Sequence, residues 1–267
     1  MSLSLVNRDQ WSPLQRYVEL LHILVERNLK GRYRGSFLGV YWSLLSPLLM
    51  TGMYTAIFGT AFKSYFGGSI VNYVLAAFTG LIIINFFSSS TMQALASVVG
   101  GGALMNKIRL PMSVFPLSMI AANVFQFAVG SFPLLAIVTL IQSKNPLYIL
   151  ALLFPLSGLI LVCTGVGFLV AALYVFFRDL PYFYELITFT LWMGSPIFYP
   201  VEIVPPQVRP FLYLNPLFPI IESIRQISLF GNLPWGLMLH CLLNGIILLA
   251  VGWLFFRAWQ DQFMDLL

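Results

Sequence analysis

Four basic side chains lie within eight residues, just before a long apolar stretch: Arg27, Lys30, Arg32 and Arg34. A guanidinium group presents a planar fork of donors that matches phosphate. Near a membrane surface, each such charge contributes about 1 kcal/mol of attraction to anionic headgroups. The cluster predicts a cytoplasmic site for the phosphate or pyrophosphate of a lipid-borne ligand, with Arg32 and Arg34 as its main contacts. Electrostatic anchoring of the chain by all four residues is the alternative.

Other reactive chemistry is scarce. None of the nine carboxylates lies in the middle of an apolar run, there are only two His and two Cys, and no glycine-rich ATP-binding motif occurs. Coupled carriers generally place an ionisable group near the membrane midplane, and metal centres need clustered ligands. The sequence therefore predicts no catalytic residue, metal or cofactor in this chain. Cys163 and Cys241 fall within apolar runs and are predicted to be free and buried.

The elements that position these residues are membrane spans. The chain of 267 residues is 59% hydrophobic and 9% charged, and its mean hydropathy is +0.88, which is typical of polytopic membrane proteins. About 20 apolar helical residues cross a hydrocarbon core of about 30 Å. An all-α membrane protein with six spans is predicted, with these bounds: Phe37–Phe62, Tyr73–Leu95, Val114–Ile141, Leu147–Phe177, Tyr182–Tyr199 and Trp235–Phe256.

Lysine and arginine set the predicted orientation. Cytoplasmic loops carry an excess of these residues. With the N-terminus inside, ten of the 14 fall on the cytoplasmic side of the predicted spans: Arg8, Arg16, Arg27, Lys30, Arg32, Arg34, Lys107, Arg109, Arg178 and Arg257. The exceptions, predicted to be external, are Lys63, Lys144, Arg209 and Arg225. Both termini are therefore expected in the cytoplasm. The net charge of +5 comes from residues that flank apolar runs, so no nucleic-acid partner is expected.

Residues 1–36 form a predicted cytoplasmic segment, followed by a membrane domain over residues 37–267. Ser12 reads as an N-cap, with Pro13 at the first helical position and Gln15 completing a capping box. The helix that follows is amphipathic but too polar to span, and we expect it along the cytoplasmic interface; packing on a protein partner is the alternative. Gly35 and Gly39, four residues apart, are predicted to allow close helix approach.

Two connecting segments stand out. Residues 200–234 carry seven prolines among strongly apolar residues, which predicts short external re-entrant helices before the last span, because non-spanning backbone at membrane depth must be covered. Residues 96–113 are predicted to be a cytoplasmic coupling loop. There, a flexible break at Gly100–Gly102 precedes a basic amphipathic turn that fits a groove on another protein; its docking residues are Asn106, Lys107, Ile108 and Arg109.

Aromatic residues make up 16% of the chain. Aromatic faces suit sugars and wet interfaces, although Trp and Tyr near span ends also form interfacial belts. The predicted conduit residues are Tyr41, Trp42, Tyr54, Phe183, Tyr184 and Trp192. Pro47 is expected to kink the first span and to free the carbonyl of Ser43, and an Arg178–Asp179 ion pair is expected to hold the turn after the fourth span.

Several segments together resemble the membrane subunit of ABC-2-type exporters, specifically the permeases for O-antigen, capsular polysaccharide or teichoic acid. They are Arg27–Gly39 running into Tyr41–Leu48, then Asn106–Pro111, then Arg178-Asp179 with Ser195–Pro200, and finally Leu214–Leu217 with Arg225. The ordered set covers nearly the whole chain. Leu110 departs from the family pattern, in which an aromatic residue often precedes the proline; an apolar contact at that position suffices for docking.

The resemblance implies a homodimer of six-span subunits around one conduit, with two copies of a cytoplasmic ATPase that binds ATP and Mg. It implies that the ATPase acts on the coupling loop and on the N-terminal helix to export a lipid-linked glycan or polyol-phosphate polymer across a bacterial cytoplasmic membrane. An ABC-2 permease for a drug, haem or simple lipid is the neighbouring alternative. A scaffold of an envelope-glycan synthesis complex and an intramembrane lipid-modifying enzyme are alternatives from other classes, although the missing acid–base and metal groups disfavour the enzyme.

Overall fold

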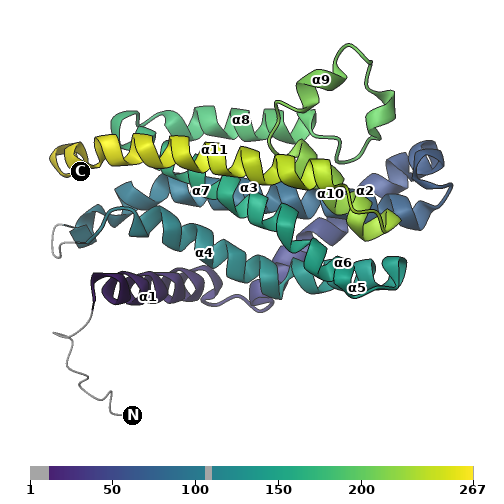
Figure 1. Ribbon diagram of the computed structural model, residues 1–267. Coiled ribbons are helices and arrows are strands. Elements are labelled where there is room, and N and C mark those ends of the chain that lie inside the picture. The colour runs from purple at the N-terminus through teal and green to yellow at the C-terminus, as the bar shows by residue number, and fades with distance from the viewer. Residues whose placement is uncertain (1–11, 106–109, 267) are drawn as a thin grey trace.

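The computed structural model describes residues 12–105 and 110–266, and the described residues form helices and connecting turns without a β-strand (Figure 1). The α-helices are α1 Pro13–Tyr33, α2 Trp42–Phe62, α3 Ile70–Met105, α4 Val114–Val129, α5 Ser131–Ser143, α6 Leu147–Ala151, α7 Leu153–Phe176, α8 Leu180–Gly194, α9 Arg209–Leu212, α10 Phe218–Phe230, α11 Trp235–Trp259 and α12 Phe263–Leu266. Short 3₁₀ turns precede α2 at Gly39–Tyr41 and follow it at Lys63–Phe66. An all-α architecture is therefore confirmed.

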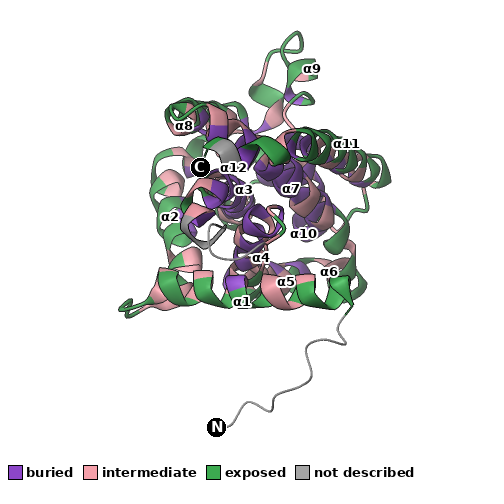
Figure 2. Ribbon diagram, turned by 90° about the vertical axis from the view of Figure 1, so that its left-hand side faces the viewer, coloured by how far each residue is buried: buried purple, intermediate pink, exposed green. Residues whose placement is uncertain are grey.

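The helices α3, α7 and α10 form the centre of the bundle, whereas the outer faces of α2, α8 and α11 are exposed (Figure 2). Glycines bring α7 and α11 into backbone contact: a Cβ at Gly252 would lie 1.9 Å from the carbonyl oxygen of Gly165. Small residues at such crossings allow close packing between helices in lipid. Cys163 and Cys241 lie free and buried within this core, as predicted.

Among the described residues, four stretches are long and apolar enough to span a membrane: Gly39–Phe66, Ile70–Gly102, Leu147–Phe176 and Trp235–Gln262. The third predicted span is instead a bent pair, α4 and α5, with an angle of 44° at Gly130, which makes five if the pair counts as one span. The fifth predicted span yields only the 15 residues of α8. It ends there because Ser195 precedes Pro196, and a residue before proline is pushed out of the helical region; Ser195 is extended, with ψ 138°.

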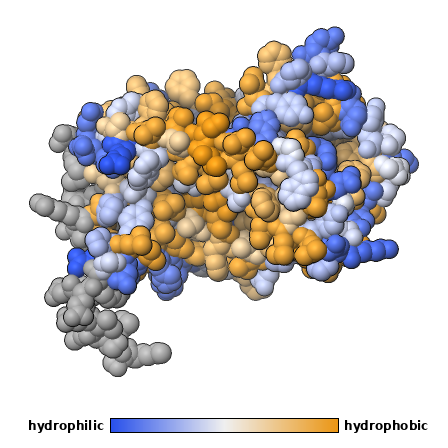
Figure 3. Space-filling view, in the orientation of Figure 1, coloured by the Kyte–Doolittle hydropathy of each residue, from blue (hydrophilic) through white to orange (hydrophobic). Residues whose placement is uncertain are grey.

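The surface agrees with a membrane location. In Figure 3, an apolar belt crosses the middle of the molecule and polar residues gather toward its two ends. The exposed side chains of α11 include Leu243, Ile246, Ile247 and Leu254. Large contiguous apolar surfaces of this kind mark contact with lipid or with another protein. The structure therefore describes a membrane-embedded, multi-pass bundle.

The helix α1 begins as predicted. The Ser12 N–H donates to Gln15 Oε1 at 3.0 Å and the Gln15 N–H donates to Ser12 Oγ at 3.3 Å, so the capping box is confirmed. The helix lies on the outside of the bundle against α4 (Figures 1 and 2). Leu24 is its buried residue, whereas Leu14 and Val18, on the predicted apolar face, are exposed.

Gly35 and Gly39 serve the turn between α1 and α2. Their φ angles are +78° and +50°, and a Cβ at either position would meet no other atom within 4 Å. The predicted close helix approach is therefore wrong. These positions need glycine because the left-handed region is costly for residues with a Cβ.

The connections sort into two ends (Figure 1). The α3–α4 and α7–α8 connections and the C-terminus lie at one end, and the α2–α3 connection, the α5–α6 connection and α9 lie at the other. At the first end, α3 continues without a break through Gly100–Gly102 to Met105, so the predicted flexible glycine break is wrong. Helix continuity is supported by packing, since a Cβ at Gly101 would lie 2.6 Å from the Phe115 ring.

The proline-rich segment at the other end contains a 3₁₀ turn at Val201–Ile203, the short α9 and the longer α10. Helix α9 projects from the bundle, whereas α10 packs against α5, α11 and α3 and is largely buried. Arg225, expected to be an external charge, lies in α10 and is only 3% exposed. Backbone carbonyls of other elements surround this side chain, as described below, so Arg225 is a buried cation.

Candidate functional site: a polar cavity beside Arg32

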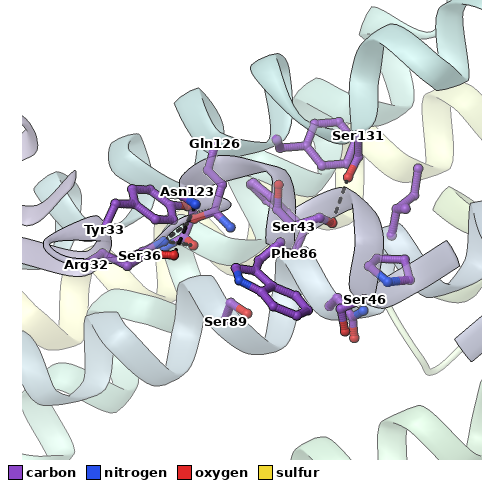
Figure 4. Close-up of a pocket in the computed structure, with 16 residues that line it drawn as sticks. Arg32, Tyr33, Ser36, Ser43, Ser46, Phe86, Ser89, Asn123, Gln126 and Ser131 are labelled. Carbon is purple, nitrogen blue, oxygen red and sulfur yellow. Dashed lines mark hydrogen bonds between the residues drawn. The ribbon is translucent and has the colours of Figure 1, made fainter. Parts of the chain in front are cut away.

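A cavity of about 500 Å³ opens where the end of α1, the start of α2, and the helices α3, α4 and α5 meet (Figure 4). Most of its lining side chains are polar, although the surrounding helices are apolar. The polar residues are Arg32, Tyr33, Ser36, Ser43, Ser46, Asn85, Ser89, Asn123, Gln126 and Ser131; Gly39, Trp42, Pro47, Ile82, Phe86 and Phe127 complete the wall. Polar groups inside membrane helices are expensive and usually mark functional paths.

Arg32 joins three elements at the edge of this cavity. Its Nη1 donates to Asn123 Oδ1 at 3.1 Å and to Gln126 Oε1, both on α4, and its Nη2 donates to Gln93 Oε1 on α3. Asn123 Nδ2 also donates to Gln93 Oε1 at 3.0 Å. The guanidinium is thus held by neutral side-chain amides, and its charge is not cancelled by any of them.

Helical spacing explains how these amides converge. Asn85, Ser89 and Gln93 recur every four residues along α3 and therefore share one face. Asn123 and Gln126 are three apart on α4, which again places them on one face. These residues were not predicted from the sequence, because they are uncharged and the prediction relied on ionisable groups within the spans. The detectable signal was polar residues recurring at helical spacing within apolar runs.

Two interruptions of regular helix lie beside the cavity: Pro47 within α2 and the bend at Gly130 between α4 and α5. Pro47 lies inside α2 and cannot donate to the carbonyl of Ser43; the hydroxyl of Ser131 donates to that oxygen at 3.3 Å. Gly130, at the α4–α5 bend, lets α2 approach, since a Cβ there would lie 2.2 Å from Ser43 Oγ. Ser131, the first residue of α5, thereby supplies the hydrogen bond to the Ser43 carbonyl that Pro47, which has no N–H, cannot make.

The electrostatics of the cavity favour an anion. Arg32 is a cation, and none of the 16 lining residues is acidic. The nearby Glu26 is already bonded to Lys30 at 2.5 Å on the exposed side of α1, and this hydrogen bond and charge lower the pKa of the Glu26 carboxyl. Burial raises the pKa of the Tyr33 phenol, so it remains a neutral donor. A cationic fork, hydroxyls and amide N–H groups together suit phosphate oxygens.

The structure separates the four predicted headgroup residues. Arg32 lies at the cavity, whereas Arg34 and Lys30 are exposed outside it. Arg27 lines a second, smaller cavity of about 220 Å³ with Gln93, Ser97 and Ser118. Gln93, which lines this second cavity, also accepts a hydrogen bond from Arg32.

The predicted conduit aromatics fall into three groups. Trp42 lines the Arg32 cavity, and Tyr41 beside it is 68% exposed. Tyr54 and Trp192 meet across α2 and α8 with ring centroids 6.3 Å apart, and they line an apolar cavity of about 330 Å³. Phe183 is 62% exposed, and Tyr184 is buried against Leu95 and Val170. Only Tyr54 and Trp192 come together.

Arg178 and Asp179, in the connection between α7 and α8, lie at the first end of the bundle. Arg178 Nη2 donates to the Leu266 carbonyl at 3.3 Å, and its guanidinium lies over the Tyr174 ring at 5.8 Å. Across the part of the chain that is described, no ion pair joins Arg178 to Asp179, contrary to expectation. The predicted docking residues Asn106, Lys107, Ile108 and Arg109 lie outside the described residues.

Fold and cavity together define a class: a helical membrane protein with a polar, cationic recess among otherwise apolar helices. A family model described as "ABC-2 type transporter" matches residues 19–229. That range includes the Arg32 cavity, both interruptions of regular helix and Arg225. The chain belongs to the ABC-2 type transporter family.

Individual relatives match over almost their full length. An O-antigen export system permease protein RfbA of Klebsiella pneumoniae is 29% identical over 251 residues, which cover 93% of this chain and 95% of the relative. The O-antigen export system permease protein RfbA of Myxococcus xanthus is 30% identical over 258 residues, covering 94% of this chain and 96% of the relative. The similarity therefore extends over both ends of the bundle.

Proposed function

We propose that this chain is the membrane subunit of an ATP-driven exporter that moves a lipid-linked polysaccharide of the O-antigen type across the bacterial cytoplasmic membrane. The observation that carries the proposal is the nearly full-length similarity to O-antigen export permeases. The Arg32 cavity supports it, because a cationic recess without acidic residues suits the phosphate of a lipid carrier.

The assembly follows from the same proposal. Two copies of the chain surround the conduit, and two copies of a cytoplasmic ATPase bind ATP and Mg. The six-span topology is retained by counting the α4–α5 pair and the short α8 as spans, with both termini in the cytoplasm. The end of the bundle that carries Arg32, the α3–α4 connection and the C-terminus is then the cytoplasmic end.

Substrate handling divides between the two ends. Arg32, with Arg27, Lys30 and Arg34 around it, attracts the anionic headgroup at the cytoplasmic end. Tyr54 and Trp192 offer aromatic faces to sugars toward the external end. The α9 and α10 segment closes the external end of the conduit. The loop around Asn106–Arg109 contacts the ATPase and transmits its conformational change to the membrane helices.

Purification with partners, followed by reconstitution, tests the proposal. The chain is extracted from native membranes, its partners and their stoichiometry are identified, and the complex is placed in proteoliposomes with a lipid-linked O-polysaccharide. ATP-dependent transfer of the glycan is expected. An ATPase-containing complex that moves a drug, haem or simple lipid but not the glycan would overturn the substrate assignment, and a chain that purifies without an ATPase would overturn the exporter.

The docking role has its own test. Replacing Lys107 and Arg109 together with Glu is expected to abolish coupling to the ATPase while the chain still folds, which a normal elution profile and helical content would verify. Normal export by this variant would contradict the docking assignment.

A further inference from the structure

A short irregular segment, Ser195–Tyr199, follows α8, and side chains from other elements donate to three of its backbone carbonyls. Arg225 Nη1 donates to the Pro196 carbonyl at 2.6 Å and Nη2 donates to the Ile197 carbonyl at 2.8 Å. The Tyr73 hydroxyl donates to the Phe198 carbonyl at 3.0 Å. Non-helical backbone at membrane depth is stable only when protein satisfies its polar groups, and here three successive carbonyls are satisfied in this way.

The same guanidinium also binds α3. Its Nε and Nη2 donate to the Ala76 carbonyl at 3.1 and 2.9 Å. Gly80, one turn further along α3, makes room for this contact: a Cβ there would lie 3.2 Å from the Ile197 Cα and 3.3 Å from Arg225 Nη2. One buried side chain thus ties α10, the segment after α8, and the outer part of α3 together.

The segment after α8 positions an aromatic cluster. The ring of Phe198 stacks on Tyr54 of α2 with centroids 3.5 Å apart and contacts Trp192 edge-on at 5.5 Å. At the first residue of the segment, Asn215 Nδ2 donates to Ser195 Oγ at 2.8 Å. The apolar cavity between α2 and α8 therefore depends on where Arg225 holds Phe198.

The helix α3 links this cluster to the opposite end of the bundle. It is continuous over 36 residues, about 54 Å at about 1.5 Å per residue. Gln93, which binds Arg32, lies about 26 Å along the helix from Ala76 by the same rise. A continuous helix whose two parts are bonded to different guanidinium groups can carry an axial displacement from one end to the other.

We propose that Arg225 is a positioning residue for export: by tying Ser195–Tyr199 to α3, it makes Phe198 follow the movements of α3 and so opens and closes the Tyr54–Trp192 cavity. The inference rests on the proposed exporter function. Arg225 contacts backbone only and acts through Phe198. A planar guanidinium is required, because a single ammonium on a flexible stem cannot serve three carbonyls from two elements in this fork geometry.

The test compares ATP hydrolysis with glycan transfer in proteoliposomes that contain the full complex. Arg225→Lys and Arg225→Gln are expected to lower transfer at least about tenfold while hydrolysis stays within about twofold, since several charge-assisted hydrogen bonds are lost. Arg209→Gln is the matched control. Arg209 lies toward the same end, but its guanidinium donates only within its own loop, to Val204 and Glu202 carbonyls, so both activities should be unchanged.

A second variant guards against a folding defect. Gly80→Ala keeps Arg225 and pushes Ile197 away from α3, so it should lower transfer relative to hydrolysis in the same direction. Equal losses of hydrolysis and transfer in the Arg225 and Gly80 variants would show a purely structural role and overturn the proposal, and so would unchanged transfer.

Crosslinking separates this inference from the exporter itself. In the double variant Tyr54→Cys and Phe198→Cys, bifunctional-maleimide crosslinking in the complex should depend on ATP, and Arg225→Gln should remove that dependence. If the wild-type complex hydrolyses ATP without moving the glycan, the proposed substrate is wrong. Crosslinking that depends on nucleotide would still support the linkage of Phe198 to α3 through Arg225. Crosslinking that ignores ATP in the wild-type background would overturn the linkage even if export is normal.

Discussion

Two arginines on either side of the bundle, Arg32 and Arg225, both contact α3 but are held in different ways. Arg225 is 3% exposed and gives all its recorded hydrogen bonds to backbone carbonyls. Arg32 is partly exposed and gives its hydrogen bonds to the side-chain amides of Gln93, Asn123 and Gln126, at the edge of a cavity. The same side chain therefore meets fixed acceptors at one site and movable acceptors at the other.

The difference indicates how each arginine works. Backbone carbonyls cannot turn away without distorting their helix or turn, so Arg225 fixes architecture. Amide side chains can rotate and bond to water or to one another, so Arg32 can exchange a neutral acceptor for an anionic oxygen, which forms the stronger hydrogen bond. Burial alone would not have distinguished the two roles; the identity of the acceptors does.

The same substitution at both arginines gives the largest expected contrast. Arg225→Gln leaves the buried Pro196 and Ile197 carbonyls without the donors that Arg225 supplies and should lower the free energy of unfolding by about 3 kcal/mol or more. Arg32→Gln should lower it by only about 1 kcal/mol, because its amide partners reach water in the cavity. Thermal unfolding of the purified protein in one detergent measures both; equal losses would contradict the distinction.

The next largest effect on stability is expected at Gly130, where α2 packs closely against the α4–α5 bend. Gly130→Ala would place a methyl group 2.2 Å from Ser43 Oγ, and we expect a loss of about 2 kcal/mol from overpacking. Adding Ser43→Ala should recover part of that loss, because the clashing hydroxyl is gone.

Gly52→Ala in α2 is the control for that change, because a Cβ there meets nothing within 4 Å. It should be neutral or stabilise by up to about 1 kcal/mol, as alanine does in an exposed helix. Thermal unfolding that ranks Gly52→Ala below Gly130→Ala would refute the close approach of α2 to the α4–α5 bend.

Export itself should distinguish the basic residues. Arg32→Gln is expected to reduce glycan transfer about tenfold, the effect of losing one charge-assisted contact to a phosphate. Arg34→Gln, on an exposed side chain, should reduce it less. Transfer rates at several ionic strengths provide the measurement, because long-range attraction by Arg34 is screened by salt. A larger defect at Arg34 than at Arg32 would move the headgroup site out of the cavity.

The smallest effect is expected at the surface pair of α1. Lys30 lowers the pKa of Glu26 from its ordinary 4.5, so the pair contributes above that pH and its contribution is lost only as the pH falls through the depressed value. Exposed pairs contribute little. Lys30→Gln should therefore leave stability unchanged near neutral pH and should reduce transfer less than Arg32→Gln does, because Lys30 only adds to the long-range attraction of the headgroup. A loss of transfer as large as that of Arg32→Gln would instead place Lys30 in direct contact with the headgroup.

Sequence reasoning reached some elements because local chemistry specifies them. The capping box at Ser12 and Gln15, the apolar runs and the burial of both cysteines follow from short-range pattern and hydropathy. It failed where two distant segments meet. Gly35 and Gly39 were assigned to helix packing although the turn after α1 uses them, and Gly100–Gly102 were assigned to a break although packing of Gly101 against Phe115 accompanies a continuous helix.

A helical membrane protein of the ABC-2 type, with a basic N-terminal segment and a proline-broken segment before the last apolar run, could be predicted from the chain alone, because hydropathy, charge and ordered motifs are properties of the sequence. The tertiary structure decided which of its cations remain available for a ligand. Arg32 and Arg225 look alike in the sequence, since each is an arginine beside apolar residues. Only the packing of α3, α4 and the segment after α8 supplies amides to one and backbone carbonyls to the other. Local pattern does not reveal these hydrogen-bond partners, because they lie between 28 and 149 residues away in the sequence.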